Sequence, residues 1–503
     1  MPPSAMALKF SYGMRTAAPG MHAAALAVLA ALQACSVGPN FSRPEPPAAA
    51  RYTSNTLTIE QPVNAGGAQH VVFGTEIEGA WWSLFGSDEI DGIVKQALEH
   101  NRTLKAAAQT LAQAQELALA QAGLRYPQVS LSGGVGRQKY GAEFLGGFTV
   151  PPFTYFAVGP SVSYTLDYTG GIARSVEQQQ AQAEAVRQQL DAAYLSVSGQ
   201  AVMQTLAIAS TAAQISTVET ILEQDRDNLK LVRTAFENGL VARIDVVSAE
   251  SQIASDSALL PPLRQELSSA HHALSLILGR TPDAELPADL QLAQIALPSE
   301  VPVSLPSELA HRRPDILAAE ANLHAATSAV GIAEWNLYPK IQLTASVGQQ
   351  SATPGGLFDR SGTAWSLLSG LTMPLFDGGT LRAQKRAAVD AMRASAANYE
   401  QTVLEAFTQV ADLLEALSHD AEQLAAQDQA QQAAETNLGL TRAAYQEGNV
   451  GILQVLDAQR SYQQARLGYV KAVAQRYLDT VQLFLALGGT SPHLLDRRNA
   501  NHL

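Results

Sequence analysis

One unit of about 200 residues occurs twice in the chain, and this duplication limits its possible folds more than any other feature. Residues 126–131 (YPQVSL) return 212 positions later as residues 338–343 (YPKIQL). Residues 235–251 return 209 positions later as residues 444–460. Because the two spacings agree within a few residues, we infer that one whole unit of about 200 residues is duplicated.

The duplication divides the chain into two repeats with flanking segments. The pair Gly170-Gly171, followed by an arginine, also returns as Gly378-Gly379. We predict the following segments: a signal peptide at 1–34, an N-terminal tether at 35–80, a first repeat at 85–290, a second repeat at 300–490 and a C-terminal tail at 491–503.

In each repeat, two segments alternate apolar residues with small or polar ones. These segments are 129–135, 156–166, 341–347 and 365–373. A period of two predicts β-strands, here about ten residues long with one apolar face. The pattern fits a soluble sandwich or a transmembrane barrel. Because the smallest closed barrels have about eight strands, a membrane barrel requires strands from several chains. Residues 139–154 and 350–363 are the predicted outer loops.

Helical patterns surround the strands. An amphipathic helix at 87–124, and its counterpart beginning near 313, precede the strands and end at the Tyr-Pro pairs. Long helices follow at about 172–238 and 380–447, each roughly 100 Å long at 1.5 Å per residue. Return helices are predicted at 244–278 and 453–487, and Pro261-Pro262 should break the first of them.

The long helices carry apolar residues at spacings of four and three, which predicts a coiled-coil seam. In the second repeat the seam is Val403, Phe407, Val410, Leu414, Leu417, Ala421 and Leu424. In the first it is Ile215, Val218, Leu222, Leu229, Val232 and Phe236, with Asp225 interrupting it. The other helix faces are rich in Ala, Gln and Ser. They favour a sheet of packed helices curved into a tube over an isolated coiled coil.

Each long helix leads into a glycine turn before the return helix. The turns are Gly239-Leu240-Val241 in the first repeat and Gly448-Asn449-Val450 in the second. Asp457 and Arg460 follow the second turn, three positions apart, where two charges on one helix face can pair. The first repeat has serines at both corresponding positions.

The N-terminus has the order of a secretory signal peptide. Lys9 and Arg15 precede a short apolar run, and Leu32-Gln33-Ala34-Cys35 resembles a bacterial lipobox despite the unusual Gln33. This resemblance implies N-acyl and S-diacylglycerol groups on Cys35, the only cysteine. Several acyl chains give stable anchoring at about 0.8 kcal/mol for each buried CH₂.

Composition and motifs exclude several function classes. The net charge of −13 argues against a nucleic-acid partner, because phosphate binding needs a basic patch. The glycines at 133–136 lie inside a strand pattern rather than at a strand-to-helix turn, so they predict no dinucleotide loop. His271 and His272 point to different helix faces, and one cysteine forms no cluster, so we expect no metal site. Nothing in the spacing of polar residues suggests an enzyme.

Together these residues resemble the outer-membrane factor family, the TolC-like trimeric export channels, and most closely its OprM/NodT-type lipoprotein branch. The resemblance extends from Cys35 to Gly489. Its motifs are Cys35 to Phe41 (CSVGPNF), 81–85 (WWSLF), 101–104 (NRTL), 313–316 (RPDI), 338–341 (YPKI), 376–379 (FDGG) and 456–460 (LDAQR).

The resemblance implies an α+β membrane channel in the bacterial outer membrane. Each protomer would supply four transmembrane strands and long α-hairpins, and a homotrimer would close a 12-stranded β-barrel continuous with a periplasmic α-barrel. The partners would be outer-membrane lipid, a periplasmic adaptor and an inner-membrane transporter, usually of the resistance-nodulation-division (RND) type. The channel itself would be passive.

The resemblance also implies positions for the gate. The family's gate residues correspond to Leu453, Asp457 and Arg460, with Tyr445 beside them. Three-fold symmetry would place a ring of Asp457 carboxylates at the constriction. The two glycine turns match the places where the family meets its adaptor. We therefore expect the second hairpin to be the latch and the first to serve docking and packing.

Three functions remain open at this stage. The favoured one is the exit channel of a tripartite efflux system for small molecules. A type I protein-secretion channel is the alternative within the family, and a lipobox favours efflux only by analogy. A non-conducting, structural envelope lipoprotein is the alternative outside it. The exported substrate is not readable from the sequence.

Overall fold

The computed structural model describes residues 37–45, 49, 51–53, 69–75, 77, 80–141, 146–147, 149–285 and 290–489. The predicted signal peptide, Cys35 and the predicted tail lie outside the described residues. The described chain forms two compact units, to which both repeats contribute. The sheet unit contains residues from 37–42, 116–180 and 324–393, and the helix unit contains residues from 43–115, 181–323 and 394–489.

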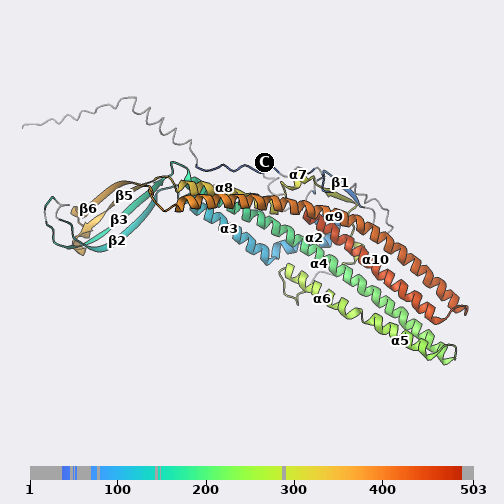
Figure 1. Cartoon of the computed structure of the whole chain (residues 1–503). Coiled ribbons are helices and arrows are strands. Elements are labelled where there is room, and N and C mark those ends of the chain that lie inside the picture. The colour runs from blue at the N-terminus through green and yellow to red at the C-terminus, as the bar shows by residue number, and fades with distance from the viewer. Residues whose placement is uncertain are drawn as a thin grey trace, which may run out of the picture. The chain divides into compact units, whose positions relative to one another are not determined.

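The sheet unit is built on four antiparallel strands in the order β2-β3-β5-β6 (Figure 1). Their bounds are Gln128–Gln138 (β2), Phe153–Leu166 (β3), Lys340–Ser351 (β5) and Thr363–Thr372 (β6). All four strands predicted from the alternating pattern are confirmed. Val129 and Leu131 on β2, like Leu367 and Leu371 on β6, are more than two-thirds exposed. One face of the sheet therefore presents apolar side chains to its surroundings.

The second outer loop is shorter than predicted. Strand β5 continues to Ser351 and β6 begins at Thr363, so both strands include residues that were predicted to belong to the loop. Between them lie two 3₁₀ turns, η4 (Pro354–Phe358) and η5 (Arg360–Gly362). Pro354 suits the first turn of such an element because its missing N–H is not needed there.

Both long helices are confirmed. They are α4 (Gly171–Glu237) and α9 (Thr380–Gln446). The first return helix breaks as predicted into α5 (Arg243–Ser257) and α6 (Leu260–Ile277), with both prolines in the first turn of α6. The second, α10 (Ile452–Ala486), is continuous because it contains no proline. Among the described residues, no helix has the length and hydropathy needed to span a bilayer.

The helices that precede the strands were predicted with unequal success. The second, α8 (Pro314–Trp335), begins at its predicted proline. The prediction of one helix at 87–124 is wrong, because Asn101 separates α2 (Asp88–His100) from α3 (Arg102–Gly123). The side-chain oxygen Oδ1 of Asn101 accepts hydrogen bonds from the amides of Thr103 and Leu104, while its side-chain Nδ2 donates to the carbonyl of Ile277. Asn101 thus caps α3 and ties it to α6.

The two predicted seams also differ. In α9 six of the seven seam residues are buried and Phe407 is partly buried. In α4 only Val218, Leu222 and Val232 are buried, whereas Phe236 is exposed. The α4 seam instead includes the buried polar residue Asp225. The prediction for the first repeat is therefore wrong in part.

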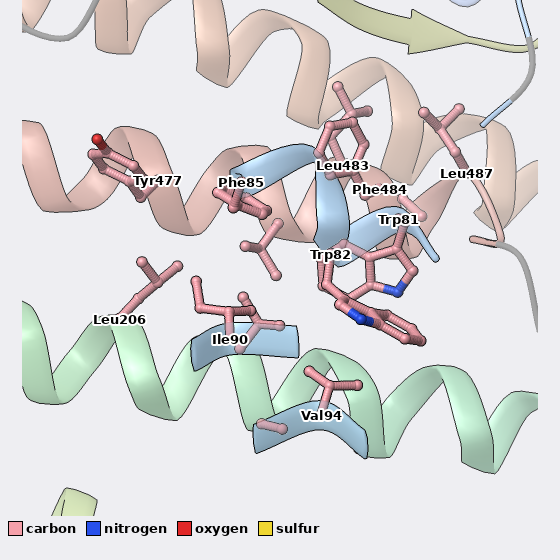
Figure 2. Packing of buried hydrophobic residues seen from close by; sticks show 14 of the residues in the cluster. Trp81, Trp82, Phe85, Ile90, Val94, Leu206, Tyr477, Leu483, Phe484 and Leu487 are labelled. Atoms are coloured by element: carbon pink, nitrogen blue, oxygen red, sulfur yellow. The ribbon is translucent and has the colours of Figure 1, made fainter. Parts of the chain in front are cut away.

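The core of the helix unit contains an aromatic hub, which comprises Trp81, Trp82, Phe85, Tyr477 and Phe484 (Figure 2). The 3₁₀ element η1 (Trp81–Phe85) inserts three of these rings between α4 and α10. The Phe484 ring centroid lies 6.1 Å from that of Trp81 and 6.2 Å from that of Phe85. Such aromatic contacts stabilise a core beyond their buried area, so the hub holds the C-terminal part of α10 in place.

Short elements complete the helix unit. Strands β1 (His70–Phe73) and β4 (Glu300–Val303) form a parallel pair, with His70 opposite Glu300. The 3₁₀ turn η3 (Leu292–Gln294) and the single-turn helix α7 (Pro306–Leu309) flank β4 in the chain. Strand β1 lies in the segment predicted as a tether, so part of that segment belongs to the folded body.

Candidate functional site at the tips of the helical hairpins

The two glycine turns have the same local structure. Gly239 and Gly448 adopt left-handed backbone angles, with φ of +69° and +78°, which favour glycine. In the first turn, the amide of Gly239 donates to the carbonyl of Phe236 and that of Leu240 to Ala235. The amides of Gly448 and Asn449 make the corresponding bonds to Tyr445 and Ala444. The duplication therefore extends to the hydrogen bonds that end the helices.

An apolar tip cluster supports the turns from inside the helix unit. It consists of Val232, Leu438, Ile452, Val455, Ala458 and Tyr462, from α4, α9 and α10. Tyr445 and Val241 are partly buried against it. Two predicted site residues thus pack inward and help to fix the turns.

Three of the four predicted gate residues lie on the other face of α10. Arg460 and Asp457 form the predicted ion pair, and both side chains are more than half exposed. Leu453 is 52% exposed and lies one turn before Asp457 on the same helix. The structure therefore brings Leu453, Asp457 and Arg460 together and places Tyr445 apart from them.

These three residues line a groove, the mouth groove, with a volume of about 720 Å³. Its other lining residues are Gln454 and Leu456 of α10 and Ile244, Val247, Ser248, Ser251 and Gln252 of α5. The serines are the first-repeat counterparts of Asp457 and Arg460. The groove thus has charges on its α10 side and neutral side chains on its α5 side.

The extreme ends of the turns are open. Leu240 is 78% exposed, and no heavy atom lies within 4 Å of a Cβ built on Gly239 or Gly448. Asn449 is exposed and Val450 is partly buried. The predicted docking residues therefore form an exposed end on each hairpin, with Leu240 as its most exposed apolar side chain.

A buried polar cluster near the mouth groove escaped the sequence-based prediction of the site. It consists of Asp225 and Asn228 of α4 and Gln459 and Gln463 of α10, all less than 10% exposed. The side-chain amides of Gln459 and Gln463 donate to Asp225 Oδ1 over 2.6 and 3.1 Å, and Asn228 donates to Gln459. The interruption of the α4 seam at Asp225 was the signal of this cluster. It connects the two hairpins within the helix unit.

Asp225 also faces Asp256 of α5. Burial, together with the hydrogen bond to Asp256 and its negative charge, raises the pKa of Asp225 to about 7. Asp225 Oδ2 has no donor among the described residues. A proton on this oxygen would allow it to donate to Asp256.

The described residues contain no group of three or more histidine, cysteine, aspartate or glutamate side chains that could hold a metal ion. His271 and His272 both lie on α6. The tips thus have charged and exposed side chains along a groove, supported by an apolar cluster and a polar one.

Comparisons with known proteins show which family the chain is similar to. A family model described as "Outer membrane efflux protein" matches residues 93–280 and 305–489. Outer membrane protein OprJ of Pseudomonas aeruginosa is 30% identical over 488 residues, which cover 94% of this chain and 96% of that protein. Cation efflux system protein CusC of Escherichia coli is 26% identical over 92% of this chain and 97% of its own. The solved structure of the outer-membrane channel OprN has a TM-score of 0.79 at 27% identity, covering 91% of this chain and 99% of that one.

Proposed function

Because the chain belongs to the outer membrane efflux protein family, we propose that it is the passive exit channel of a tripartite, RND-type efflux system that exports small molecules. Membership of this family places the chain in the outer membrane, and the fold is the TolC-like α+β channel fold. The observation that most directly supports the proposal is the sheet, whose apolar face is exposed and whose edge strands β2 and β6 each leave one side unpaired among the described strands. Unpaired edges are sites for pairing with another chain.

The duplication allows the pairing of subunits to be worked out. Gln128 of β2 lies opposite Ser163 of β3, and Lys340 of β5 lies opposite Thr372 of β6. Gln128 and Lys340 are equivalent positions of the two repeats. Ser163 and Thr372 are therefore equivalent as well, and β3 corresponds to β6 with a fixed register.

Strand β3 also pairs with β5, with Ser163 opposite Thr344. The first-repeat equivalent of Thr344 is Ser132 of β2. If the same pairing is repeated between subunits, Thr372 of one copy lies opposite Ser132 of the partner subunit. Both residues belong to the small and polar face, so this register keeps the apolar residues of β6 and β2 on one common face.

Repetition of this contact by three copies would join four strands from each into a closed, 12-stranded barrel. Closure removes all sheet edges, and the exposed apolar residues would face lipid. This contact is head-to-tail, and such a contact forms a ring when its rotation closes. The proposed homotrimer thus accounts for both the unpaired edges and the exposed apolar face.

We assign the gate to the mouth groove. Three copies of Asp457 around a common axis would form a ring of charge, which selects and gates permeating molecules. An exposed ion pair such as Asp457–Arg460 is worth only about 0–1 kcal/mol. Docking of a periplasmic adaptor on the exposed turns could therefore break it. In this proposal the chain is an N-acyl, S-diacylglycerol lipoprotein anchored through Cys35.

Two measurements on the full chain test the proposal together. Thr372→Cys combined with Ser132→Cys should give thiol-crosslinked trimers, whereas Thr372→Cys with Gly136→Cys is displaced by about 13 Å along the strand and should not. The crosslinked trimer should conduct ions across a planar bilayer. Monomers without conductance would refute the channel and leave a structural lipoprotein, and efficient crosslinking of the displaced pair alone would refute the register.

A further inference from the structure

The segment that directly follows Cys35 is bound to the sheet unit. Val37 is 8% exposed, and its amide donates to the carbonyl of Thr169 over 3.1 Å. Thr169 lies between the end of β3 at Leu166 and the start of α4 at Gly171. A freely moving tether would show no such contact, so residues 37–41 are part of the folded unit.

Arg174 of α4 binds this segment with two of its three guanidinium nitrogens. Its Nε donates to the carbonyl of Val37 over 3.0 Å, and Nη2 donates to Oδ1 of Asn40. Its third nitrogen, Nη1, donates to Glu177 over 2.7 Å. Arg174 is 5% exposed, and hydrogen bonds to a buried charged group are stronger than those between neutral groups.

Glu177 and His324 complete the binding site. Glu177 lies 2.8 Å from Nε2 of His324, whose ring stacks on Phe41 with a centroid distance of 4.4 Å. Burial opposes ionisation of Glu177, but hydrogen bonds from His324 and Arg174 hold its pKa below the usual value. Glu177 therefore stays charged and orients both residues that contact the segment.

Two glycines allow the segment to approach the body closely. A Cβ on Gly38, which has a φ of +80°, would lie 2.4 Å from the Cα of Gly331 in α8. A Cβ on Gly331 would lie 2.9 Å from the carbonyl oxygen of Val37 and 3.0 Å from Cγ of Arg174. All three distances are shorter than van der Waals contact, so either position requires glycine for this seating.

We propose that Thr169, Arg174, Glu177, His324 and Gly331 form a notch that binds residues 37–41 and thereby fixes the lipid anchor beside the strand-to-helix junction of the sheet unit. Only Ser36 separates Cys35 from Val37, so the anchor lies within about 7 Å of this residue. The inference rests on the proposed acylation of Cys35. It adds that the notch, rather than the lipid alone, sets where the acyl chains enter the membrane.

The length of chain between Cys35 and its first contact with the body determines how strongly the notch restricts the position of the lipid anchor. With the notch occupied, the first contact with the body is at Val37, two positions after Cys35. If the notch releases the segment, the next described contact is that of Arg43 with Glu320 in the helix unit, at 2.8 Å, eight residues after Cys35. The effective concentration of a tethered group falls as about the −3/2 power of linker length. Release from the notch would therefore lower the effective concentration of the lipid anchor at the strand-to-helix junction about eightfold.

Hydrogen exchange of the acylated full chain tests the binding step. Arg174→Ala and Gly331→Ala should each remove the protection of the Val37 amide, which donates to the carbonyl of Thr169. Alanine favours a helix more than glycine does, so a loss of protection in Gly331→Ala reports exclusion of the segment and not a weaker α8. Arg187→Ala is the matched control, because it removes the same i,i+3 pairing with Glu184 in α4. Full protection in both test variants would overturn the proposal.

A second experiment separates placement of the lipid from simple stabilisation. Urea-unfolded chain is diluted into vesicles of phosphatidylethanolamine and phosphatidylglycerol, and insertion is followed by protection of the strands from protease. Arg174→Ala and Gly331→Ala should slow insertion about eightfold in the acylated chain, and not at all in Cys35→Ser. Equal slowing in both backgrounds would show a purely structural role and refute the proposal.

The lipid premise has its own readout. Metabolic acyl labelling should be present in Arg174→Ala and Gly331→Ala and lost in Cys35→Ser. If the unaltered chain carries no acyl label, the inference fails through its premise. The conductance and crosslinking of the trimer are measured independently, so they would still decide the channel function.

Discussion

Replacement of Asp225 by asparagine should make the protein more stable at pH 8 while changing little at pH 4. Asparagine has nearly the same shape and still accepts the hydrogen bonds from Gln459 and Gln463. It cannot ionise, and its amide can donate to Asp256. The substitution therefore removes only the need to bury a second negative charge beside Asp256.

The raised pKa of Asp225 determines the direction in which its contribution to stability changes with pH. Asp225 has a pKa of about 7 in the folded protein and an ordinary value of 3.8. Its contribution to stability is fully present below pH 3.8 and is lost as the pH rises to about 7. At 1.36 kcal/mol per pH unit the loss is at most about 4 kcal/mol. Because Asp256 is partly exposed, solvent screens its charge, and we expect a gain of about 2 kcal/mol for Asp225→Asn at pH 8.

The assay is thermal unfolding in detergent, followed by circular dichroism at 222 nm between pH 4 and pH 8. Asp227→Asn is the matched control, since Asp227 is exposed on the same helix. Burial and the neighbouring Asp479 also raise the pKa of Asp420 to about 7. Asp420 is unchanged in every variant, so it adds the same pH dependence to all of them. A gain of the same size at pH 4 and pH 8, or no gain over Asp227→Asn, would refute the reasoning.

Three further substitutions test other parts of the structure. Asp457→Ala combined with Arg460→Ala should raise the resting conductance of the trimer in planar bilayers, because the exposed ion pair at the mouth groove is lost; an unchanged leak would contradict the gate assignment. Asn101→Ala should lower the free energy of unfolding by about 1–2 kcal/mol, because α3 loses its cap and the carbonyl of Ile277 its donor, and urea titration measures this. Leu414→Ala in the buried α9 seam should cost about 2–5 kcal/mol, whereas Phe236→Ala should cost less than about 0.5 kcal/mol; equal losses would contradict the seam as the structure has it.

Periodicity was sufficient to predict the long elements. The strands have a clear period of two, and α4 and α9 have long stretches without proline, so local pattern and tertiary structure agree there. The break before α6 was predictable for the same reason, because Pro261 and Pro262 remove backbone donors regardless of what surrounds them.

Contacts between distant parts of the chain decided the features that sequence patterns missed. Asn101 ends α2 because its side chain reaches Ile277, 176 positions away. Strand β1 has four residues and pairs with β4, 230 positions away. Asp225 belongs to the seam of α4 because two side-chain amides on α10 donate to its Oδ1. In the candidate site, charge pairing on one helix was predictable, but the polar cluster behind it was not.

The continuity of α10 has a mechanical consequence. The aromatic hub holds this helix from Tyr477 to Phe484, and Asp457 lies 20 residues before Tyr477, so the helix extends about 30 Å from the hub to Asp457. A pivot of about 5° at the hub would move Asp457 by roughly 2.6 Å at this radius. The broken partner helix can bend between Ser257 and Leu260, which shortens its own arm to α5 alone. A small rotation deep in the helix unit is thus magnified on the charged side of the groove and absorbed on the neutral side.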